Sequence, residues 1–99
     1  AIIGVSTNQL DQVSLATSAP VTYLAFGPVF TTTNLSRHKD VQGPVRLAAV
    51  RKSTQLPLVA IGGLGSNNLA SVRDLCDAWA VIGAICDADD PVAATRALL

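Results

Sequence analysis

The hydrophobic and polar positions of the chain predict four strands, each followed by a helix. Short apolar runs at residues 2–6, 21–26, 58–61 and 78–82 show little alternation. Such runs are typical of strands buried on both faces, as in a parallel sheet covered by helices. Amphipathic helical patterns follow at residues 8–19, 44–53, 66–76 and 92–98. Strands that alternate with helices in this way predict parallel βαβ units.

Residues that favour helix starts mark the same four boundaries. Asn8 and Asp11 have a spacing that resembles a capping box, and Pro44 suits the first turn of its helix. Ser66 and Asp90 are predicted N-caps of the third and fourth helices. We therefore expect the third helix to begin directly after the third strand.

Two glycine-containing steps follow the last two predicted strands. Gly62 and Gly63 end the third apolar run, and Gly83 with Ala84 follows the fourth. Because glycine has no Cβ, a bound group can approach the backbone there, and the N–H groups of a helix capped by Ser66 would point into the same crevice. The step therefore predicts either an anion site, most often for phosphate, or simply a tight turn between strand and helix.

Four βα units form either a small open sheet or half of an eightfold barrel. Phosphate sites in such barrels use the loops after the last two strands, which here carry the two glycine steps. We therefore favour an α/β fold with a parallel (βα)4 half of a TIM (βα)8 barrel, as a single domain over residues 1–99.

Composition excludes several classes of function. Apolar residues make up 49% of the chain and aromatic residues only 4%, so aliphatic side chains must fill the core. The formal net charge is zero and no basic stripe occurs, which argues against nucleic-acid partners and anionic membranes. No apolar run approaches the roughly 20 residues of a membrane span.

Cys76 and Cys86 have no CxxC spacing, so we expect neither a zinc site nor a disulfide framework. They are predicted to be buried small hydrophobic residues in a cytoplasmic protein. No secretion signal is recognised. The chain contains no Met and opens at Ala1 directly before a strand, which fits a segment cut from a longer chain.

In sequence order, the chain resembles the carboxy-terminal half of the thiamine-phosphate synthase and thiazole tautomerase family. The matching motifs are IGVST at 3–7, FGPVF at 26–30, VQG at 41–43, VAIGG at 59–63 and VIGAI at 81–85. The resemblance implies barrel strands five to eight. It also implies an enzyme that joins a pyrimidine diphosphate to a thiazole phosphate, releasing pyrophosphate and using Mg²⁺.

The resemblance assigns expected roles to individual residues. Ser6 matches a serine on the pyrimidine side, and Thr32 and Asn34 match two threonines near the phosphates. The expected backbone cradle for the thiazole phosphate consists of Gly62, Gly63, Ile82 and Gly83. Pro28 stands where the tautomerase has a histidine, which favours the synthase.

The long loop at residues 27–43 departs from the family pattern. Leu35 replaces a lysine that meets the pyrophosphate, so a nearby cation is needed to stabilise the leaving group. Arg37 and Lys39 are the candidates for this cation. The alternative is that both side chains simply lie on a solvent-exposed face of the loop. His38 has no paired carboxylate and is expected to be exposed to solvent.

The metal ligands of the family lie in the amino-terminal half, so no metal ligands are expected in this chain. Asp89 and Asp90 sit at a helix start and do not replace them. Three hypotheses follow: half of a synthase, a non-catalytic or tautomerase-like phosphate-binding relative, and a purely structural half-barrel. In each, the chain is expected to pair with a missing half-barrel or with itself.

Overall fold

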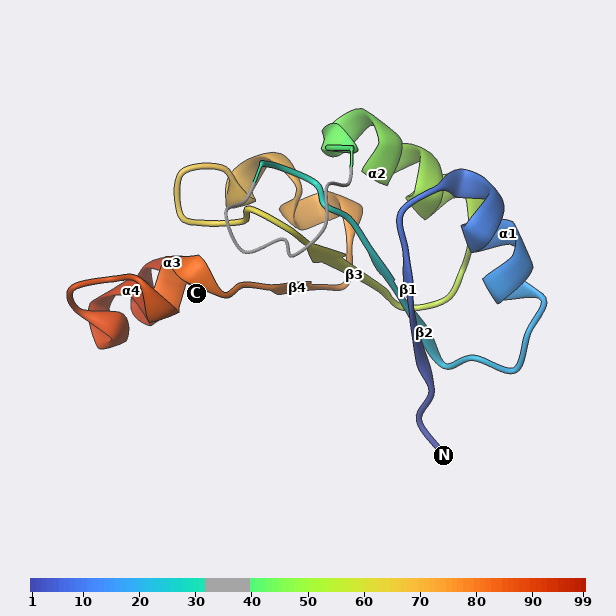
Figure 1. Cartoon of the computed structure of the whole chain (residues 1–99), viewed down its shortest axis with the longest axis horizontal. Coiled ribbons are helices and arrows are strands. Elements are labelled where there is room, and N and C mark those ends of the chain that lie inside the picture. Colours follow the sequence, from blue (N-terminus) through green and yellow to red (C-terminus); the bar gives the residue numbers. More distant parts are fainter. Residues whose placement is uncertain (32–39) are drawn as a thin grey trace.

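The structure is a computed structural model that describes residues 1–31 and 40–99. Four strands, β1 (Gly4–Thr7), β2 (Tyr23–Phe26), β3 (Leu58–Ile61) and β4 (Ala78–Ala80), form one sheet in the order β1-β2-β3-β4 (Figure 1). All three pairings are parallel. The predicted parallel α/β fold is thus confirmed, and β3 has the predicted bounds. Strand β1 lies one to two residues later than predicted, β2 begins two residues later, and β4 ends two residues earlier.

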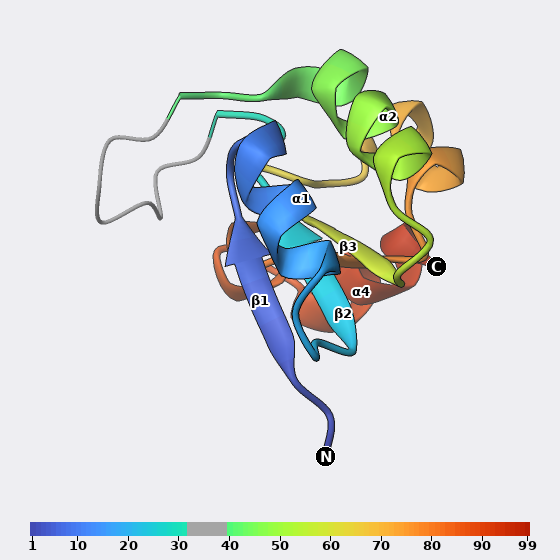
Figure 2. The ribbon, with the colours of Figure 1, turned by 90° about the vertical axis from the view of Figure 1, so that its right-hand side faces the viewer.

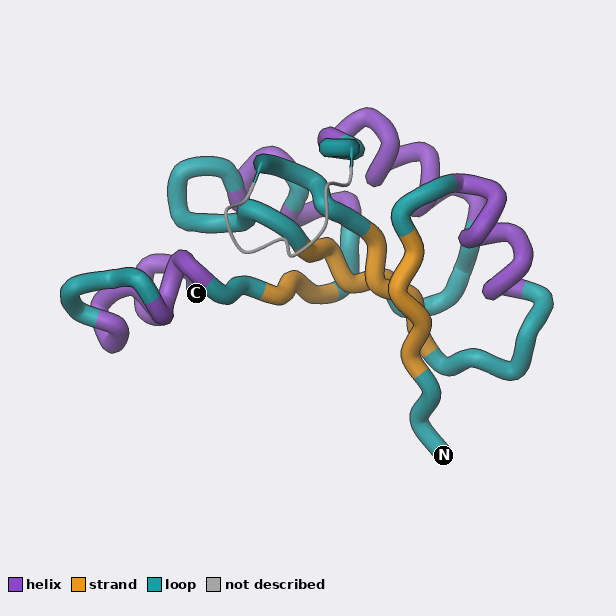
Figure 3. The backbone as a smooth tube through the Cα atoms, in the orientation of Figure 1, coloured by secondary structure: helices purple, strands orange, loops and turns teal. Residues whose placement is uncertain are grey.

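The helices are α1 (Leu10–Thr17), α2 (Gly43–Ser53), α3 (Gly83–Cys86) and α4 (Pro91–Leu98). Two 3-10 turns, at Leu69–Ser71 and Arg73–Leu75, replace the α-helix predicted over residues 66–76. Helices α1 and α2 contact each other on one face of the sheet (Figure 2). In Figure 3 the strands form a band, with α1 and α2 above it and the α3–α4 pair beyond the end of β4.

Within residues 1–31 and 40–99, helices cover one face of the sheet. Leu24 and Phe26 of β2 and Leu58 and Ala60 of β3 are fully buried and point toward the helices. The residues between them, whose side chains point to the opposite face of the sheet, are half-buried or exposed; Ile61, for example, is 38% exposed. The prediction of strands buried on both faces was therefore wrong for this chain. Side chains from all eight strands fill the interior of a closed barrel, so four strands alone leave that face open.

The core is aliphatic, as predicted. Phe26 is the one aromatic residue among the buried residues that the structure describes; the others are Val13, Ala16, Leu24, Val29, Leu47, Val50, Leu58, Ala60, Leu64, Leu69, Val72 and Leu98. Cys76 is half-buried, and burial raises the pKa of its thiol. Cys86 is exposed, so the prediction that it is buried was wrong.

The capping predictions had mixed outcomes. Asp90 accepts a hydrogen bond from the Ala93 N–H at 3.1 Å, which confirms it as the N-cap of α4. Near α1, the Asn8 N–H donates to Gln12 Oε1 at 2.8 Å, so Gln12 rather than Asp11 closes the turn. Ser66 is exposed and its hydroxyl makes no hydrogen bond within the described residues, because no α-helix follows it to be capped.

Strands β1 and β4 lie at the two ends of the strand order, so each has a single partner within the described sheet. The molecule is elongated, with principal extents of 42 × 28 × 24 Å. No helix in the described parts of the chain has the length and apolarity needed to cross a bilayer.

Candidate functional site

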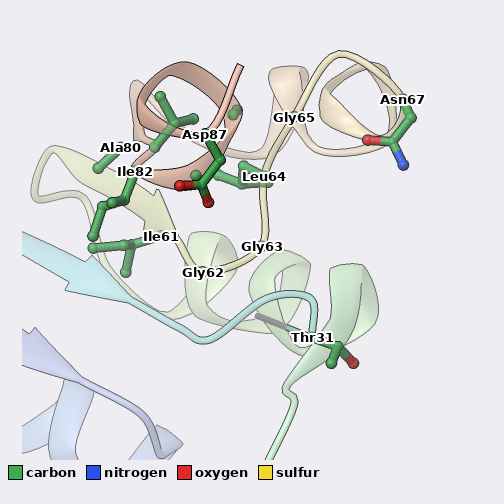
Figure 4. A pocket seen from close by; sticks show the side chains of 13 residues that line it. Thr31, Ile61, Gly62, Gly63, Leu64, Gly65, Asn67, Ala80, Ile82 and Asp87 are labelled. Carbon is green, nitrogen blue, oxygen red and sulfur yellow. The ribbon is translucent and has the colours of Figure 1, made fainter. Parts of the chain in front are cut away.

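A pocket of about 390 Å³ lies at the carboxyl ends of β3 and β4 (Figure 4). Four predicted cradle residues, Gly62, Gly63, Ile82 and Gly83, line it together. The remaining lining residues are Thr31, Ile61, Leu64, Gly65, Asn67, Ala80, Val81, Ala84 and Asp87. The two glycine steps singled out in the sequence therefore meet at one site.

The turn after β3 needs glycine for two reasons. Gly62 and Gly63 have φ values of +103° and +67°, in the region that side chains disfavour. A Cβ on Gly63 would collide with the Thr31 carbonyl oxygen, and one on Gly62 would lie 2.5 Å from Pro28 Cα. The missing Cβ atoms thus make room for the segment after β2. The expectation that they also let a ligand approach the backbone stays a prediction.

The segment after β2 is fastened to this turn at the rim of the pocket. The Val29 N–H donates to the Ile61 carbonyl and the Phe30 N–H donates to the Gly62 carbonyl, each at 3.0 Å. Returning from the loop, the Gln42 and Gly43 N–H groups donate to Pro28 and Val29 carbonyls at 2.7 and 2.9 Å. Both described ends of the long loop are therefore fixed close to the pocket, where Thr31 forms part of the wall.

The pocket wall offers unpaired backbone donors. The N–H groups of Gly63, Leu64, Gly83 and Ala84 donate to no acceptor among the described residues. Free main-chain N–H groups that line a concave surface are a common way of binding an anion. Here they come from the turn after β3 and from the first two residues of α3, the two glycine steps from which the anion site was predicted.

The Asn68 side chain holds the glycine turn from behind. Its Nδ2 donates to the Gly63 carbonyl at 2.9 Å, and its Oδ1 accepts from the Gly65 N–H at 2.9 Å. Asn68 was not among the site residues predicted from the sequence. An asparagine shortly after a glycine-rich turn is a known turn-stabilising signal and would have pointed to it.

Charge in the described wall is negative. The carboxylate of Asp87, which follows α3, points into the pocket (Figure 4). No lysine or arginine belongs to the described lining. The described wall therefore offers a phosphate backbone donors but no cationic side chain.

The structure does not bring Ser6 into this pocket. Ser6 lies on β1, in register with Ala25 of β2, and lines a separate shallow groove beside α1 that also contains Gln12 and Leu15. Strand β1 is two strands away from β3 in the sheet. The remaining predicted site residues, Thr32, Asn34, Arg37 and Lys39, lie outside the described residues, as do Leu35 and His38.

The described residues do not fit a magnesium site. No three histidine, cysteine, aspartate or glutamate side chains converge anywhere in residues 1–31 and 40–99. Magnesium prefers octahedral oxygen coordination with one or two carboxylates. Asp87 is the one carboxylate in the described part of the pocket wall, while Asp90 is engaged in capping α4.

The fold and the pocket define half of a (βα)8 barrel with a candidate anion site at the carboxyl end of its strands. A family model for TMP-TENI, described as thiamine monophosphate synthase, matches residues 1–85. The chain belongs to this family, which confirms the resemblance inferred from the sequence motifs.

Individual relatives agree with this assignment. The chain is 47% identical over 81 residues to a thiamine-phosphate synthase from Koribacter versatilis, covering 81% of this chain and 38% of that protein. It is 40% identical over 99 residues to the thiamine-phosphate synthase of Laribacter hongkongensis, covering 99% of this chain and 46% of that one.

A solved structure shows the same fold. Thiamine phosphate pyrophosphorylase from Pyrococcus furiosus matches with a TM-score of 0.87 and 35% identity, over 98% of this chain and 46% of that one. The chain thus spans less than half the length of each of these three relatives.

Proposed function

We propose that this chain is the thiazole-phosphate-binding half of a thiamine-phosphate synthase. The complete enzyme would join hydroxymethylpyrimidine diphosphate to thiazole phosphate and release pyrophosphate. The observation that carries the proposal is the pocket at the ends of β3 and β4, with unpaired N–H groups from both turns among the described residues. These are the two positions at which barrels of this kind bind phosphate.

The pocket suits a small phosphorylated heterocycle. Its volume of about 390 Å³ is within the range of small-molecule sites. Ile61, Leu64 and Ile82 supply apolar surface for a ring, and the N–H groups of the two turns supply donors for a phosphate. The thiazole phosphate is therefore the substrate assigned to this pocket.

The diphosphate of the other substrate needs a cation close to it as it departs. Arg37 and Lys39 are proposed for this task, with Thr32 and Asn34 near the phosphates and Ser6 on the pyrimidine side. Support comes from the loop ends, since the Gln42 N–H and the Pro28 carbonyl fix the base of that loop beside the pocket.

Magnesium remains part of the proposal, with its ligands outside this chain. A cytoplasmic location is also proposed, and the two free thiols of Cys76 and Cys86 are consistent with a reducing compartment. The remainder of the barrel, or a second copy of the chain, would cover the open face of the sheet.

A second candidate is a non-catalytic phosphate-binding relative. Leu35 in place of the family's lysine favours it, because a neutral side chain cannot stabilise a departing diphosphate. Both candidates require phosphate binding at the same two turns, whereas a purely structural half-barrel does not.

Calorimetric titration of the chain with thiazole phosphate tests the proposal. The matched control ligand is the unphosphorylated thiazole alcohol. We expect binding that depends on the phosphate group. Equal affinity for both ligands, or no binding of either by the folded chain, would contradict a phosphate site in this pocket.

A further inference from the structure

We propose that Asn68 is a positioning residue that aims the Leu64 N–H at the phosphate of the substrate. The inference rests on the proposed function, because it assigns the donor that the phosphate meets in that pocket. It concerns a side chain that lies outside the pocket lining, whereas Leu64 lies within it.

One carboxamide holds two consecutive peptide units. Asn68 Nδ2 donates to the Gly63 carbonyl, and Asn68 Oδ1 accepts from the Gly65 N–H, both at 2.9 Å. The orientation of the amide is fixed by these partners, because the reverse orientation would set an N–H against an N–H and an oxygen against an oxygen. Glycine turns are otherwise free to rotate their peptide planes.

The clamp determines where the Leu64 N–H points. In a planar trans peptide the carbonyl of one residue and the N–H of the next point in opposite directions. Because the Gly63 carbonyl faces Asn68, the Leu64 N–H faces away from Asn68, and Leu64 belongs to the pocket lining whereas Asn68 does not. This N–H has no acceptor among the described residues, whereas the Gly65 N–H is occupied by Asn68.

The Asn68 backbone is itself held in place. Its carbonyl accepts from the Ser71 N–H at 3.1 Å and from the Ser71 hydroxyl at 2.6 Å. Its own N–H donates to the Gly65 carbonyl at 3.1 Å. A preorganised donor of this kind binds an anion without having to reorient on binding.

The test is a titration of the isotope-labelled chain with inorganic phosphate and with thiazole phosphate, followed by amide NMR. The Leu64 N–H proton is expected to shift downfield with both ligands, and the Gly65 N–H, which serves as the internal control, is expected to stay in place. Asn68→Asp keeps the acceptor for Gly65 but loses the donor to Gly63, so the phosphate-induced shift of the Leu64 N–H should shrink relative to the shifts of Gly83 and Ala84. Phosphate affinity should fall by about tenfold or more, because the new carboxylate also repels the anion. Ser66→Ala, which removes an exposed hydroxyl of the same loop, should bind like the unmodified chain.

The outcomes separate the inference from the proposed function. Shifts at Gly83 and Ala84 without a shift at Leu64, or an Asn68→Asp variant that binds as tightly as the unmodified chain, overturn the role of Asn68 and leave the phosphate site standing. Absence of any shift at either turn overturns both. If Asn68→Asp fails to fold, the contrast between Leu64 and Gly65 in the unmodified chain decides the inference alone.

Discussion

Asp77 and Leu58 are joined by two hydrogen bonds of 2.8 Å each, one in each direction. The Asp77 N–H donates to the Leu58 carbonyl, and Asp77 Oδ2 accepts from the Leu58 N–H. Arg51 adds a third contact, because its Nη1 lies 2.7 Å from the same carboxylate oxygen. These contacts fix the first residue of β3 against the start of β4, at the end of the sheet opposite the pocket. They therefore help to fix the register between β3 and β4, and with it the relative position of the two turns that form the site.

The stability of the fold should depend on the charge of Asp77. The hydrogen bond from the Leu58 N–H, and then Arg51, hold the pKa of Asp77 below its ordinary value. A lowered pKa stabilises the folded state above the pKa of the unfolded chain, near 3.9, and this stabilisation is lost as the pH falls through the lower folded-state value. Asp77→Asn should therefore reduce the free energy of unfolding at pH 7 by about 1 kcal/mol, a small value because the side chain is 56% exposed.

Urea unfolding between pH 7 and pH 3 measures this difference. The gap between the unmodified chain and Asp77→Asn should stay constant down to about pH 5 and shrink below about pH 4. Asp74→Asn removes an equal charge from an exposed neighbouring position and serves as the control. A gap that is the same at pH 3 as at pH 7 would show that the carboxylate charge is irrelevant.

Gly63 should be far less tolerant of a side chain than Gly43. Both have positive φ, +67° and +78°, so alanine costs roughly 1 kcal/mol at either position through backbone strain. Only at Gly63 would the new Cβ also meet the Thr31 carbonyl, whereas nothing lies within 4 Å at Gly43. Gly63→Ala should therefore lose about 1–3 kcal/mol more than Gly43→Ala and should displace the pocket rim. Chemical unfolding of the two variants compares them, and equal losses would rule out the backbone contact.

Sequence patterns predicted the parts of the fold whose signals are local. The continuous apolar run at 58–61 ends at two glycines, so β3 was placed correctly. The start of α4 was also predicted from a local signal, the N-cap Asp90 followed by Pro91. The 3-10 turns at Leu69–Ser71 and Arg73–Leu75 were missed because Leu69 and Val72 are buried at a spacing that both helix types share.

The candidate site was only partly predictable. Its location followed from the two glycine steps, since glycine at a strand end is a strong local signal. The inward carboxylate of Asp87 and the clamp by Asn68 depend on how separate segments pack, which no local pattern encodes. A second reason for glycine at position 63 could not be predicted, because it is the contact with the Thr31 backbone, thirty-two positions earlier in the chain.

The missing lysine gives a prediction about turnover. If the complete synthase is active, Leu35→Lys should raise its rate by roughly two orders of magnitude, equivalent to a few kcal/mol of transition-state stabilisation. If Arg37 or Lys39 already supplies the cation, Leu35→Lys should do little, and Arg37→Ala or Lys39→Ala should abolish activity. Pyrophosphate release measures each variant with the other half of the barrel present. No response to any of the three substitutions would exclude this loop as the source of the cation.

The chain should self-associate when the rest of the barrel is absent. The outer edges of β1 and β4 have no partner in the described sheet, and unpaired strand edges recruit other chains. Exposed Ile61 and Ile82 add apolar surface next to the open face. Sedimentation velocity at micromolar concentration should show dimers or larger species. A stable monomer with complete near-UV and far-UV dichroism would contradict the half-barrel account.

These residues are proposed to form the phosphate-binding half of a thiamine-phosphate synthase. A chimeric barrel tests this proposal, with this chain replacing the matching 46% of the Laribacter hongkongensis synthase. Two versions are needed, one with Leu35 and one with Leu35→Lys. We expect at least one folded chimera to release pyrophosphate when hydroxymethylpyrimidine diphosphate, thiazole phosphate and Mg²⁺ are all present, and to stop when thiazole phosphate is omitted. Two folded chimeras that release none would contradict the claim.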